Sequence, residues 1–470
     1  MTVRTAHAFT DDLARLDAVA TAEAVRRGDV SVPEVVEAAI ARAEAVNGQL
    51  DAIATPDFDR ARAAAAKVTR GPFVGVPMFI KDNADHEGLP TRNGSKALAN
   101  ARPAKHTSEV PEQLLAMGMV SLGKSTLPEF GFAPSCETLD GVATHNPWNL
   151  DRTPGGSSAG SAALVAAGVV PVAHGADGGG SIRIPSACCG LVGLKVSRGR
   201  LIPSLGSRLM PVDIVTEGLL TRSVRDVALH LSEAEKLYRP KRMPAVGHVT
   251  APLGRKLRVG LVSEAPMGGK VDAANRQVLE ETVALLEGLG HHVRPITFPG
   301  VEQFAEDYLQ YWSMLIWSAV HHGERLFDPS FDKTRMTDFS LMMARRFRAN
   351  MGSTPGNIIR MRGHQRTYRE LLRQSDLVLS PTLATVAPPL GYLANDQDPD
   401  QLLERLVGWM PFTPMANGTG LPAISLPLGH DDETGLPVGM MFHADLGADA
   451  LLVELALQLE EAKPWRSLAP

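Results

Sequence analysis

Two glycine-rich clusters that each end in serine constrain the fold of this chain most strongly. The sequence reads GGSS at residues 155–158 and GGGS at residues 178–181, within one small-residue stretch from Thr153 to Lys195. Glycine adopts positive φ without strain and lets the backbone approach another group closely. Between the clusters, the alanine-rich run 159–167 predicts a helix and the apolar run 169–173 predicts a strand. A helix of such small residues can pack closely against a sheet, which favours an α/β fold.

These predicted elements place the two clusters at positions typical of a binding site. Ser157 and Ser158 would lie at a helix N-terminus, whose N–H groups and dipole stabilise negative charge. The loop 177–181 would follow the carboxyl end of a strand, where open α/β sheets bind ligands. Paired serines beside backbone N–H groups indicate a site that faces a substrate, although such clusters also form plain turns.

A lysine further upstream directly follows an apolar segment. Residues 73–80 (FVGVPMFI) are short and β-prone, and they lead straight into Lys81. A lysine in this position usually extends its amine to water. If the amine is instead buried, desolvation lowers its pKa and it can act as a general base. The residues alone leave both interpretations open.

Composition excludes several classes of partner. Of 470 residues, 44% are hydrophobic and 21% are charged, as in an ordinary globular protein with a sizeable core. The net charge of −5, without long runs of Lys or Arg, argues against nucleic acid or an anionic membrane as a partner. The N-terminus has no signal-peptide pattern, and no apolar run approaches the ~20 residues of a membrane span. Three cysteines are too few for a disulfide framework, so we expect a cytoplasmic protein.

The rest of the chain predicts alternating helices and strands. Residues 11–68 read as helices, with a capping box at Ser31–Glu34. Strands at 258–262 and 292–296 flank an amphipathic helix at 272–289, which indicates a doubly wound α/β architecture. No linker is long enough to divide the chain.

Residues 300–375 form a helical region that is rich in aromatic side chains. The aromatic residues of interest are Tyr308, Tyr311, Trp312 and Trp317. We slightly favour a place for them in a substrate pocket over simple helix packing.

Three further motifs suggest other chemistry but fit it poorly. Residues 118–125 (GMVSLGKS) match the phosphate-loop pattern, yet their middle residues read as a strand. A Ser-His-Asp triad would need His145 or His174, but neither serine cluster has the GxSxG nucleophile elbow, and we expect both histidines to be structural. The Cys188-Cys189 pair lacks metal-ligand spacing and reads as core packing.

Together, the motifs resemble those of the amidase signature family. The match runs from the strand that ends at Lys81 through GGSSxGS at 155–161, DxGGSxRxPS at 177–186 and CGxxGLK at 189–195. Shorter matches are LGKS at 122–125, NPWNL at 146–150, TRSV at 221–224 and NGTGLPA at 417–423. The resemblance extends over nearly the whole chain and accounts for the false phosphate loop.

The resemblance implies one large α/β domain over residues 1–470. A mixed, twisted central sheet would be covered by helices on both faces. Residues 1–70 would form a helical N-terminal arm, residues 71–230 the catalytic core, and residues 300–410 a variable region that lines the substrate pocket.

The resemblance also implies a serine hydrolase that cleaves linear amides through an acyl-enzyme. By motif position, Ser181 would be the nucleophile, and Ser157 would be the bridging serine in a cis peptide with Gly156. Lys81 would be the general base. Neither a cofactor nor a metal is implied. Esters and carbamates are further expected substrates.

Backbone groups would stabilise the reaction. The implied oxyanion-hole donors are the N–H groups of Gly178, Gly179, Gly180 and Ser181. Loop support would come from Ser158, Asp177 and Arg183.

Some positions depart from the common family pattern. Gly178 stands where a larger residue is frequent, KVSRGR at 195–200 replaces KPTxGR, and Met441 stands where a glutamine often follows GLPVG. Within the family, the chain looks most like bacterial hydrolases such as the 6-aminohexanoate-cyclic-dimer (nylon-oligomer) hydrolases and the urethane-cleaving amidases.

Two alternatives and the assembly state remain open at this point. The alternatives are an amidotransferase subunit that acts on aminoacyl-tRNA and a nucleotide-binding protein. We expect a small-molecule amide, ester or carbamate as substrate, without a nucleic acid or membrane partner. A homodimer is one expected assembly.

Overall fold

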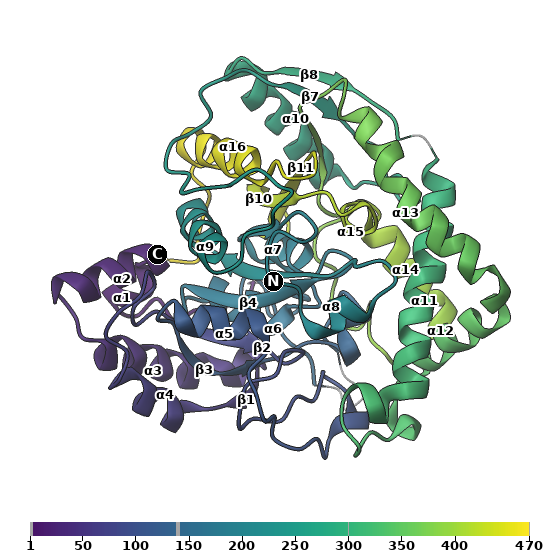
Figure 1. The fold of residues 1–470 in the computed structure, drawn as a ribbon. Helices are drawn as coiled ribbons and strands as arrows, with labels where there is room; N and C mark the ends of the chain where they lie inside the picture. The colour runs from purple at the N-terminus through teal and green to yellow at the C-terminus, as the bar shows by residue number, and fades with distance from the viewer. Residues whose placement is uncertain (1–2, 138–141, 299, 470) are drawn as a thin grey trace.

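Two β-sheets organise the fold (Figure 1). The computed structural model describes residues 3–137, 142–298 and 300–469. The small sheet has the order β1-β3-β2 and consists of β1 (Ile53–Pro56), β3 (Val120–Ser125) and β2 (Pro77–Lys81). The large sheet has the order β4-β6-β5-β10-β11-β9-β7-β8. Its strands are β4 (Val172–Asp177), β5 (Val192–Lys195), β6 (Thr216–Thr221), β7 (Arg258–Leu261), β8 (His292–Pro295), β9 (Leu377–Pro381), β10 (Ala423–His430) and β11 (Pro437–Ala444).

The large sheet is mixed, which confirms the expected fold class. Neighbouring strands are antiparallel from β4 across to β9, whereas β9, β7 and β8 are parallel. The doubly wound arrangement expected from the alternation is found at this end, where α10 (Ala273–Gly288) crosses from β7 to β8. It is wrong for the rest of the sheet. There, residues 431–436 join β10 and β11 directly as an antiparallel pair, and pairing between segments more distant in the chain gives the other antiparallel neighbours.

Helices cover both faces of the large sheet. α7 (Arg183–Cys189) packs on β5, β10 and β11, and a Cβ added to Gly439 of β11 would meet Ala187 of α7. The adjacent Val438 points to the opposite face, because successive strand residues alternate. Its partner Gly429 in β10 meets Val278 of α10 on that face. α6 (Ala159–Ala166) packs on β4 and against α7.

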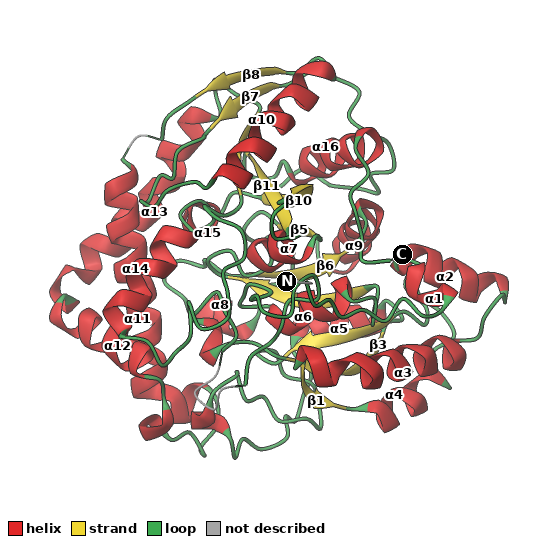
Figure 2. Ribbon diagram, turned by 180° about the vertical axis from the view of Figure 1, so that it is seen from behind, coloured by secondary structure: helices red, strands yellow, loops and turns green. Residues whose placement is uncertain are grey.

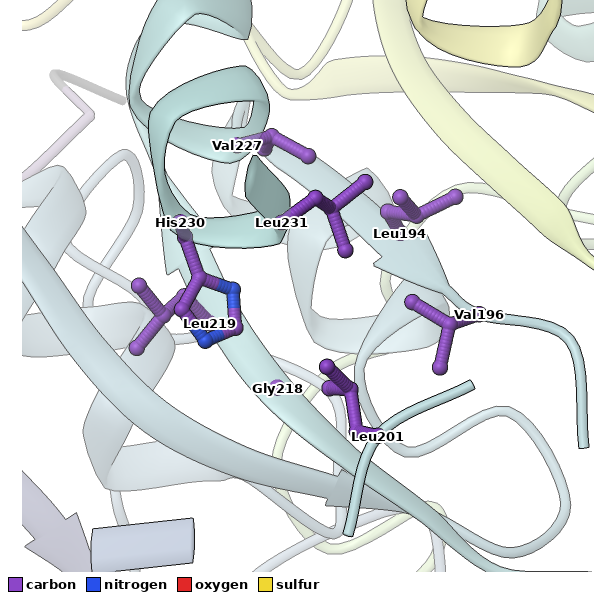
Figure 3. Close-up of a pocket in the computed structure, with 8 residues that line it drawn as sticks. All are labelled: Leu194, Val196, Leu201, Gly218, Leu219, Val227, His230 and Leu231. Carbon is purple, nitrogen blue, oxygen red and sulfur yellow. The ribbon is translucent and has the colours of Figure 1, made fainter. Parts of the chain in front are cut away.

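A small apolar pocket lies between the large sheet and α9 (Val224–Leu237), as Figure 3 shows. Its lining residues are Leu194, Val196, Leu201, Gly218, Leu219, Val227, His230 and Leu231. Leu194 faces this pocket, whereas the adjacent Gly193 faces Ser186 of α7. The sheet therefore separates this pocket from α7, and α9 covers the face opposite α7.

Two groups of helices lie on opposite flanks of the molecule (Figures 1 and 2). The N-terminal group consists of α1 (Asp12–Arg15), α2 (Ala18–Arg27), α3 (Val32–Leu50) and α4 (Phe58–Ala65). The other group consists of α11 (Val301–Leu326), α12 (Asp338–Ala349) and α13 (Thr354–Leu371). The capping box at the start of α3 is confirmed, since Ser31 and Glu34 cap each other's backbone N–H. The division into residues 1–70, 71–230 and 300–410 stays a prediction.

Further helices and 3-10 turns complete the described part of the chain. They are α5 (Glu109–Ala116), α8 (Leu205–Leu209), α14 (Pro399–Trp409), α15 (Pro414–Thr419), α16 (Asp449–Ala462) and the 3-10 turns Lys96–Leu98, Glu129–Gly131, Lys333–Arg335 and Met351–Ser353. Over the described ranges, no helix has both the length and the apolar character needed to cross a bilayer.

The segment 195–200, which departs from the family pattern, is tied to the start of α16 by Asp449. The Asp449 carboxylate accepts hydrogen bonds from the N–H and the hydroxyl of Ser197, at 2.7 and 2.8 Å. It also accepts two bonds of 3.0 Å from the Arg200 guanidinium. Both charged side chains are buried, so loss of the carboxylate leaves a buried cation without its main partner.

We therefore predict that Asp449→Ala lowers the free energy of unfolding by about 3–5 kcal/mol, as is typical for breaking a buried ion pair. As a control, Glu37→Ala breaks an exposed pair with Arg62 and leaves stability almost unchanged. Urea denaturation followed by tryptophan fluorescence measures both variants. Equal, small losses would contradict the role of Asp449.

Candidate active site

Lys81 and Ser157 meet in the interior of the protein. Lys81 is the last residue of β2, and Ser157 lies two residues before the start of α6. Lys81 Nζ lies 2.7 Å from Ser157 Oγ and donates a hydrogen bond of 3.2 Å to the carbonyl of Ala176 in β4. The two residues are 1% and 3% exposed, so the lysine does not extend to water. The peptide bond between Gly156 and Ser157 is cis, as the resemblance implies.

Burial changes the chemistry of Lys81. Desolvation lowers the pKa of its amine to about 7, against the opposing effects of Asp177, Glu217 and Cys136. Near neutral pH such an amine is partly uncharged, and its lone pair can accept a proton from the adjacent hydroxyl. Of the two interpretations of this lysine, the structure shows the buried amine and not one that extends to water.

Asp177 and Arg183 hold the loop that carries Ser181. Both are fully buried, and Arg183 Nε and Nη2 each lie 2.9 Å from a carboxylate oxygen of Asp177. Burial alone would raise the pKa of Asp177, but the charge and hydrogen bonds of Arg183 outweigh it, and the pKa lies below its usual range. The carboxylate also accepts the N–H groups of Gly180 and Ile182, at 2.8 and 3.2 Å. The loop is therefore fixed at both ends.

Ser158 joins the two serine loops. Its Oγ donates to the carbonyl of Ser181 at 2.5 Å, and its N–H donates to the same carbonyl at 3.3 Å. Ser157 and Ser181 therefore lie on loops that are bonded to each other. Ser157 is buried and Ser181 is partly exposed. Within the described part of the chain, Ser181 Oγ makes no hydrogen bond.

Two hydroxyl groups orient the glycine loop. Tyr308 of α11 donates to the carbonyl of Gly178 at 2.5 Å, and Thr413 donates to the carbonyl of Gly179 at 2.6 Å. In a trans peptide the N–H points away from the carbonyl of the same unit. The two bonds therefore set the directions of the next N–H groups, those of Gly179 and Gly180.

The N–H groups of this loop differ in their availability. That of Gly180 donates to Asp177, so it is already bonded to a carboxylate. Those of Gly178, Gly179 and Ser181 have no acceptor among the residues that the structure describes, and these three residues are partly exposed. They are three donors, close together in one loop, that are not bonded to a described residue.

Several other residues singled out from the sequence have structural contacts. His145 Nδ1 lies 2.6 Å from the carbonyl of Leu150, and His174 contacts Lys81 and Glu217, so neither histidine bonds a serine of the two clusters. Cys188 and Cys189 are buried free thiols in the core.

The phosphate-loop match is a strand, as expected. Residues Val120–Ser125 form β3, and Lys124 is buried against Asp82 at 2.9 Å instead of facing a ligand. In the described ranges, no three His, Cys, Asp or Glu side chains are grouped so that they could hold a metal.

Asn417 and Thr413 contact the site without an assigned role in the sequence, and Tyr308 was expected only as one of four pocket-lining aromatic residues. Asn417 donates to the Asp177 carboxylate at 2.9 Å and accepts from Arg183 at 2.7 Å. Its motif, NGTGLPA, was visible, but nothing local indicated this contact. Thr413 carried no local signal, and the aromatic enrichment around Tyr308 did not indicate its bond to Gly178, because both residues reach the loop from distant parts of the chain.

The aromatic side chains of α11 make different kinds of contact. Tyr308 bonds the glycine loop, whereas Tyr311 bonds the backbone N–H and carbonyl of Val212, at 2.8 and 2.7 Å. Trp312 and Trp317 pack against aromatic side chains of α12. Met441 is likewise buried, with its sulfur 3.3 Å from Arg183 Nη1.

Comparison with known proteins identifies the family of this chain. The family model described as Amidase matches residues 34–453. A Mycobacterium tuberculosis protein named "Putative amidase AmiC" is 48% identical over 463 residues, which cover 98% of this chain and 97% of that protein. A 6-aminohexanoate-cyclic-dimer hydrolase of Pseudomonas sp. is 34% identical, with 97% of this chain and 96% of that protein covered.

Solved structures agree with these relatives. A 6-aminohexanoate cyclic dimer hydrolase complexed with substrate has a TM-score of 0.87 at 32% identity, covering 97% of this chain and 98% of that chain. A bacterial aryl acylamidase of the amidase signature family has a TM-score of 0.83 at 27% identity, covering 96% of both chains. The amidotransferase and nucleotide-binding alternatives are not favoured by these matches. The chain belongs to the amidase signature family, and it is a hydrolase that acts on carbon–nitrogen bonds of amides.

Proposed function

We propose that this amidase uses Ser181 as nucleophile, Ser157 as bridging serine and Lys81 as general base. Ser181 Oγ attacks the amide carbonyl carbon while its proton passes to Ser157 Oγ and the Ser157 proton passes to Lys81 Nζ. The tetrahedral intermediate then expels the amine, which takes the proton back along the same path. The acyl-enzyme on Ser181 is finally hydrolysed by water. The buried 2.7 Å contact between Lys81 and Ser157, beside the loop of Ser181, is the observation that carries this proposal.

We place the oxyanion hole at the N–H groups of Gly178, Gly179 and Ser181. The set expected from the sequence also included Gly180, but its N–H is bonded to Asp177 and has no second direction in which to donate. The remaining donors are partly exposed and unbonded among the described residues. Fixed donors of this kind stabilise the developing oxyanion without reorganising during the reaction. Ser158, Asp177 and Arg183 support the loops.

The proposed substrates are small, linear amides, with esters and carbamates as further substrates. Apolar side chains border the glycine loop: a Cβ on Gly178 would lie 3.2 Å from Val215 Cγ2, and one on Gly179 would lie 3.6 Å from Met410 Cε. Such a wall favours an uncharged acyl group beside the reacting carbonyl. The names of the 6-aminohexanoate-cyclic-dimer hydrolases are consistent with amides of aliphatic chains.

We also propose a cytoplasmic enzyme that works without a partner protein or nucleic acid, as a homodimer. Three free, buried cysteines are compatible with a reducing compartment. Activity of the purified chain alone on a small amide would separate this proposal from an amidotransferase subunit, which would need its partners and aminoacyl-tRNA.

Removal of either end of the proton path should abolish turnover. We predict that Ser181→Ala and Lys81→Ala each lower kcat/KM for an aryl amide by at least about 10³-fold, because the three side chains act as one unit. Ser186→Ala, which removes a buried hydroxyl of α7 that makes no hydrogen bond among the described residues, serves as the control and keeps most activity. Rates on a panel of amides, esters and carbamates, with circular dichroism for folding, give the result. Full activity of Ser181→Ala would contradict the proposed mechanism.

The pH dependence should follow the lysine. Because burial lowers the pKa of Lys81 to about 7, the amine is mostly neutral above this pH and protonated below it. A protonated amine cannot accept the Ser157 proton, so we predict that kcat/KM falls about tenfold per pH unit below about pH 7. Lys81→Arg, which stays charged, should be inactive across the whole pH range. A wild-type profile that stays flat down to pH 5 contradicts Lys81 as the base.

Tyr308 should affect catalysis through the glycine loop. We predict that Tyr308→Phe lowers kcat about 10-fold to 100-fold with a small change in KM, because the Gly179 N–H loses the bond that orients its peptide unit. Tyr311→Phe is the matched control on the same helix, since its hydroxyl bonds only Val212 among the described residues. Steady-state kinetics decide the matter, and equal effects of both variants would refute a specific role for Tyr308.

A further inference from the structure

A histidine and a glutamate lie directly behind the lysine of the site. His174 of β4 is fully buried, and its Nδ1 accepts a hydrogen bond of 3.3 Å from the backbone N–H of Lys81. Its Nε2 lies 2.9 Å from Glu217 Oε2 on the neighbouring strand β6. The Glu217 side chain is 9% exposed. The sequence pattern predicted a purely structural histidine, but this chain of contacts ends at the backbone N–H of the lysine proposed as the base.

The two contacts define the proton on His174. Nδ1 accepts from a backbone N–H, so it carries no proton itself, and the single ring proton lies on Nε2. That proton is donated to the carboxylate of Glu217. An imidazolium in the same place would direct an N–H at the N–H of Lys81. The ring is therefore neutral in this arrangement, and it holds the Glu217 carboxylate in place without cancelling its charge.

Most other charges near Lys81 have a partner of opposite sign. Asp177 is paired with Arg183 at 2.9 Å, and Asp82, the next residue after Lys81, is paired with Lys124 at 2.9 Å.

Two further titratable groups in this region, Cys136 and His230, are uncharged at neutral pH. Burial raises the pKa of the Cys136 thiol to about 11, so the thiol is uncharged at neutral pH. Burial also lowers the pKa of His230, which faces His174 from α9, to about 4. Over the described ranges, no Lys or Arg pairs with Glu217. Its carboxylate is thus the uncompensated negative charge in these surroundings.

We propose that Glu217, held in place by His174, is a positioning residue that sets the proton affinity of Lys81. Desolvation alone makes the buried amine a poor proton acceptor. An unpaired carboxylate two contacts away favours the protonated amine and restores part of its basicity. A general base works best when it binds a proton with moderate strength near the working pH. This inference rests on the proposed role of Lys81 as the base.

The electrostatics of Lys81 agree with this assignment. Burial is the largest influence on the pKa of Lys81 and lowers it, whereas Asp177 and then Glu217 act in the opposite direction. Because Arg183 offsets the charge of Asp177, removal of Glu217 is the cleaner perturbation.

The test is the pH profile of kcat/KM for Glu217→Gln in the full-length protein. Glutamine keeps the size of the side chain and an oxygen that accepts the His174 proton, but it removes the charge. Since the negative charge favours protonated Lys81, its loss should move the acid limb of the profile to lower pH by about half a unit to one unit. Glu217→Asp keeps the charge, so it should move the acid limb from its wild-type position by no more than about a quarter of that shift.

A matched control separates charge from packing. Glu235→Gln changes a carboxylate of similar exposure, 11%, that pairs with Arg200 away from Lys81, and the limb should stay in place. A lower rate at every pH in Glu217→Gln with an unmoved limb would overturn the proposal. If this variant does not fold, His174→Leu, whose side chain has no donor, decides instead. It removes the donor that holds the carboxylate, so the limb should move in the same direction, and an unmoved limb again overturns the proposal.

A wrong role for Glu217 and a wrong role for Lys81 give different results in these experiments. If Lys81 is not the base, the wild-type profile has no acid limb near pH 7 and Lys81→Arg retains activity. If only the role of Glu217 is wrong, the wild-type limb is present and the variant limb coincides with it.

Discussion

The active centre depends on one desolvated amine. Lys81 is buried at 1% exposure and has a hydroxyl, a carbonyl and a histidine around it, so water cannot stabilise its charged form. In water the same side chain would be protonated at neutral pH and unable to accept a proton. The elements that surround it, β2, β4 and the loop before α6, therefore contribute to function mainly by excluding solvent from one nitrogen atom.

A second constraint is the rigidity of the glycine loop. Glycines 178–180 allow close approach to a ligand but supply no side chains that could hold the loop in place. The protein supplies these contacts from elsewhere. Asp177 and Arg183 hold the ends with the help of Asn417, while Tyr308 and Thr413 hold the middle. Residues that follow the glycine loop by more than a hundred positions thus determine how its backbone N–H groups point.

Much of this arrangement follows from local sequence. The two serine clusters, the lysine at the end of an apolar strand and the helix at 159–167 are local patterns, and the structure places them as expected, with α6 at Ala159–Ala166. The strand predicted at 169–173 instead runs over Val172–Asp177. Pro171 explains the late start, because it has no N–H to donate to a ladder.

Other features depend on contacts that no local pattern encodes. The antiparallel order of β4, β6, β5 and β10 arises from strand pairing between distant segments. The bond from Tyr308 to Gly178 joins residues 130 positions apart, and a histidine of β4 links Glu217 of β6 to the backbone N–H of Lys81 in β2. The hydrogen bond from the Gly180 N–H to Asp177 could not be predicted either. The motif gives the residue types but not the direction of each peptide unit.

The reacting groups come from two different sheets. Lys81 ends β2 of the small sheet, whereas Asp177 and the loop of Ser181 continue from β4 at the edge of the large sheet, and β2 packs against β4 without sharing a ladder with it. The hydrogen bonds of either sheet can therefore stay intact while the two separate slightly at this seam. If Lys81 and Ser181 act as proposed, a loosening of the contact between β2 and β4 would lower activity while the secondary structure persists.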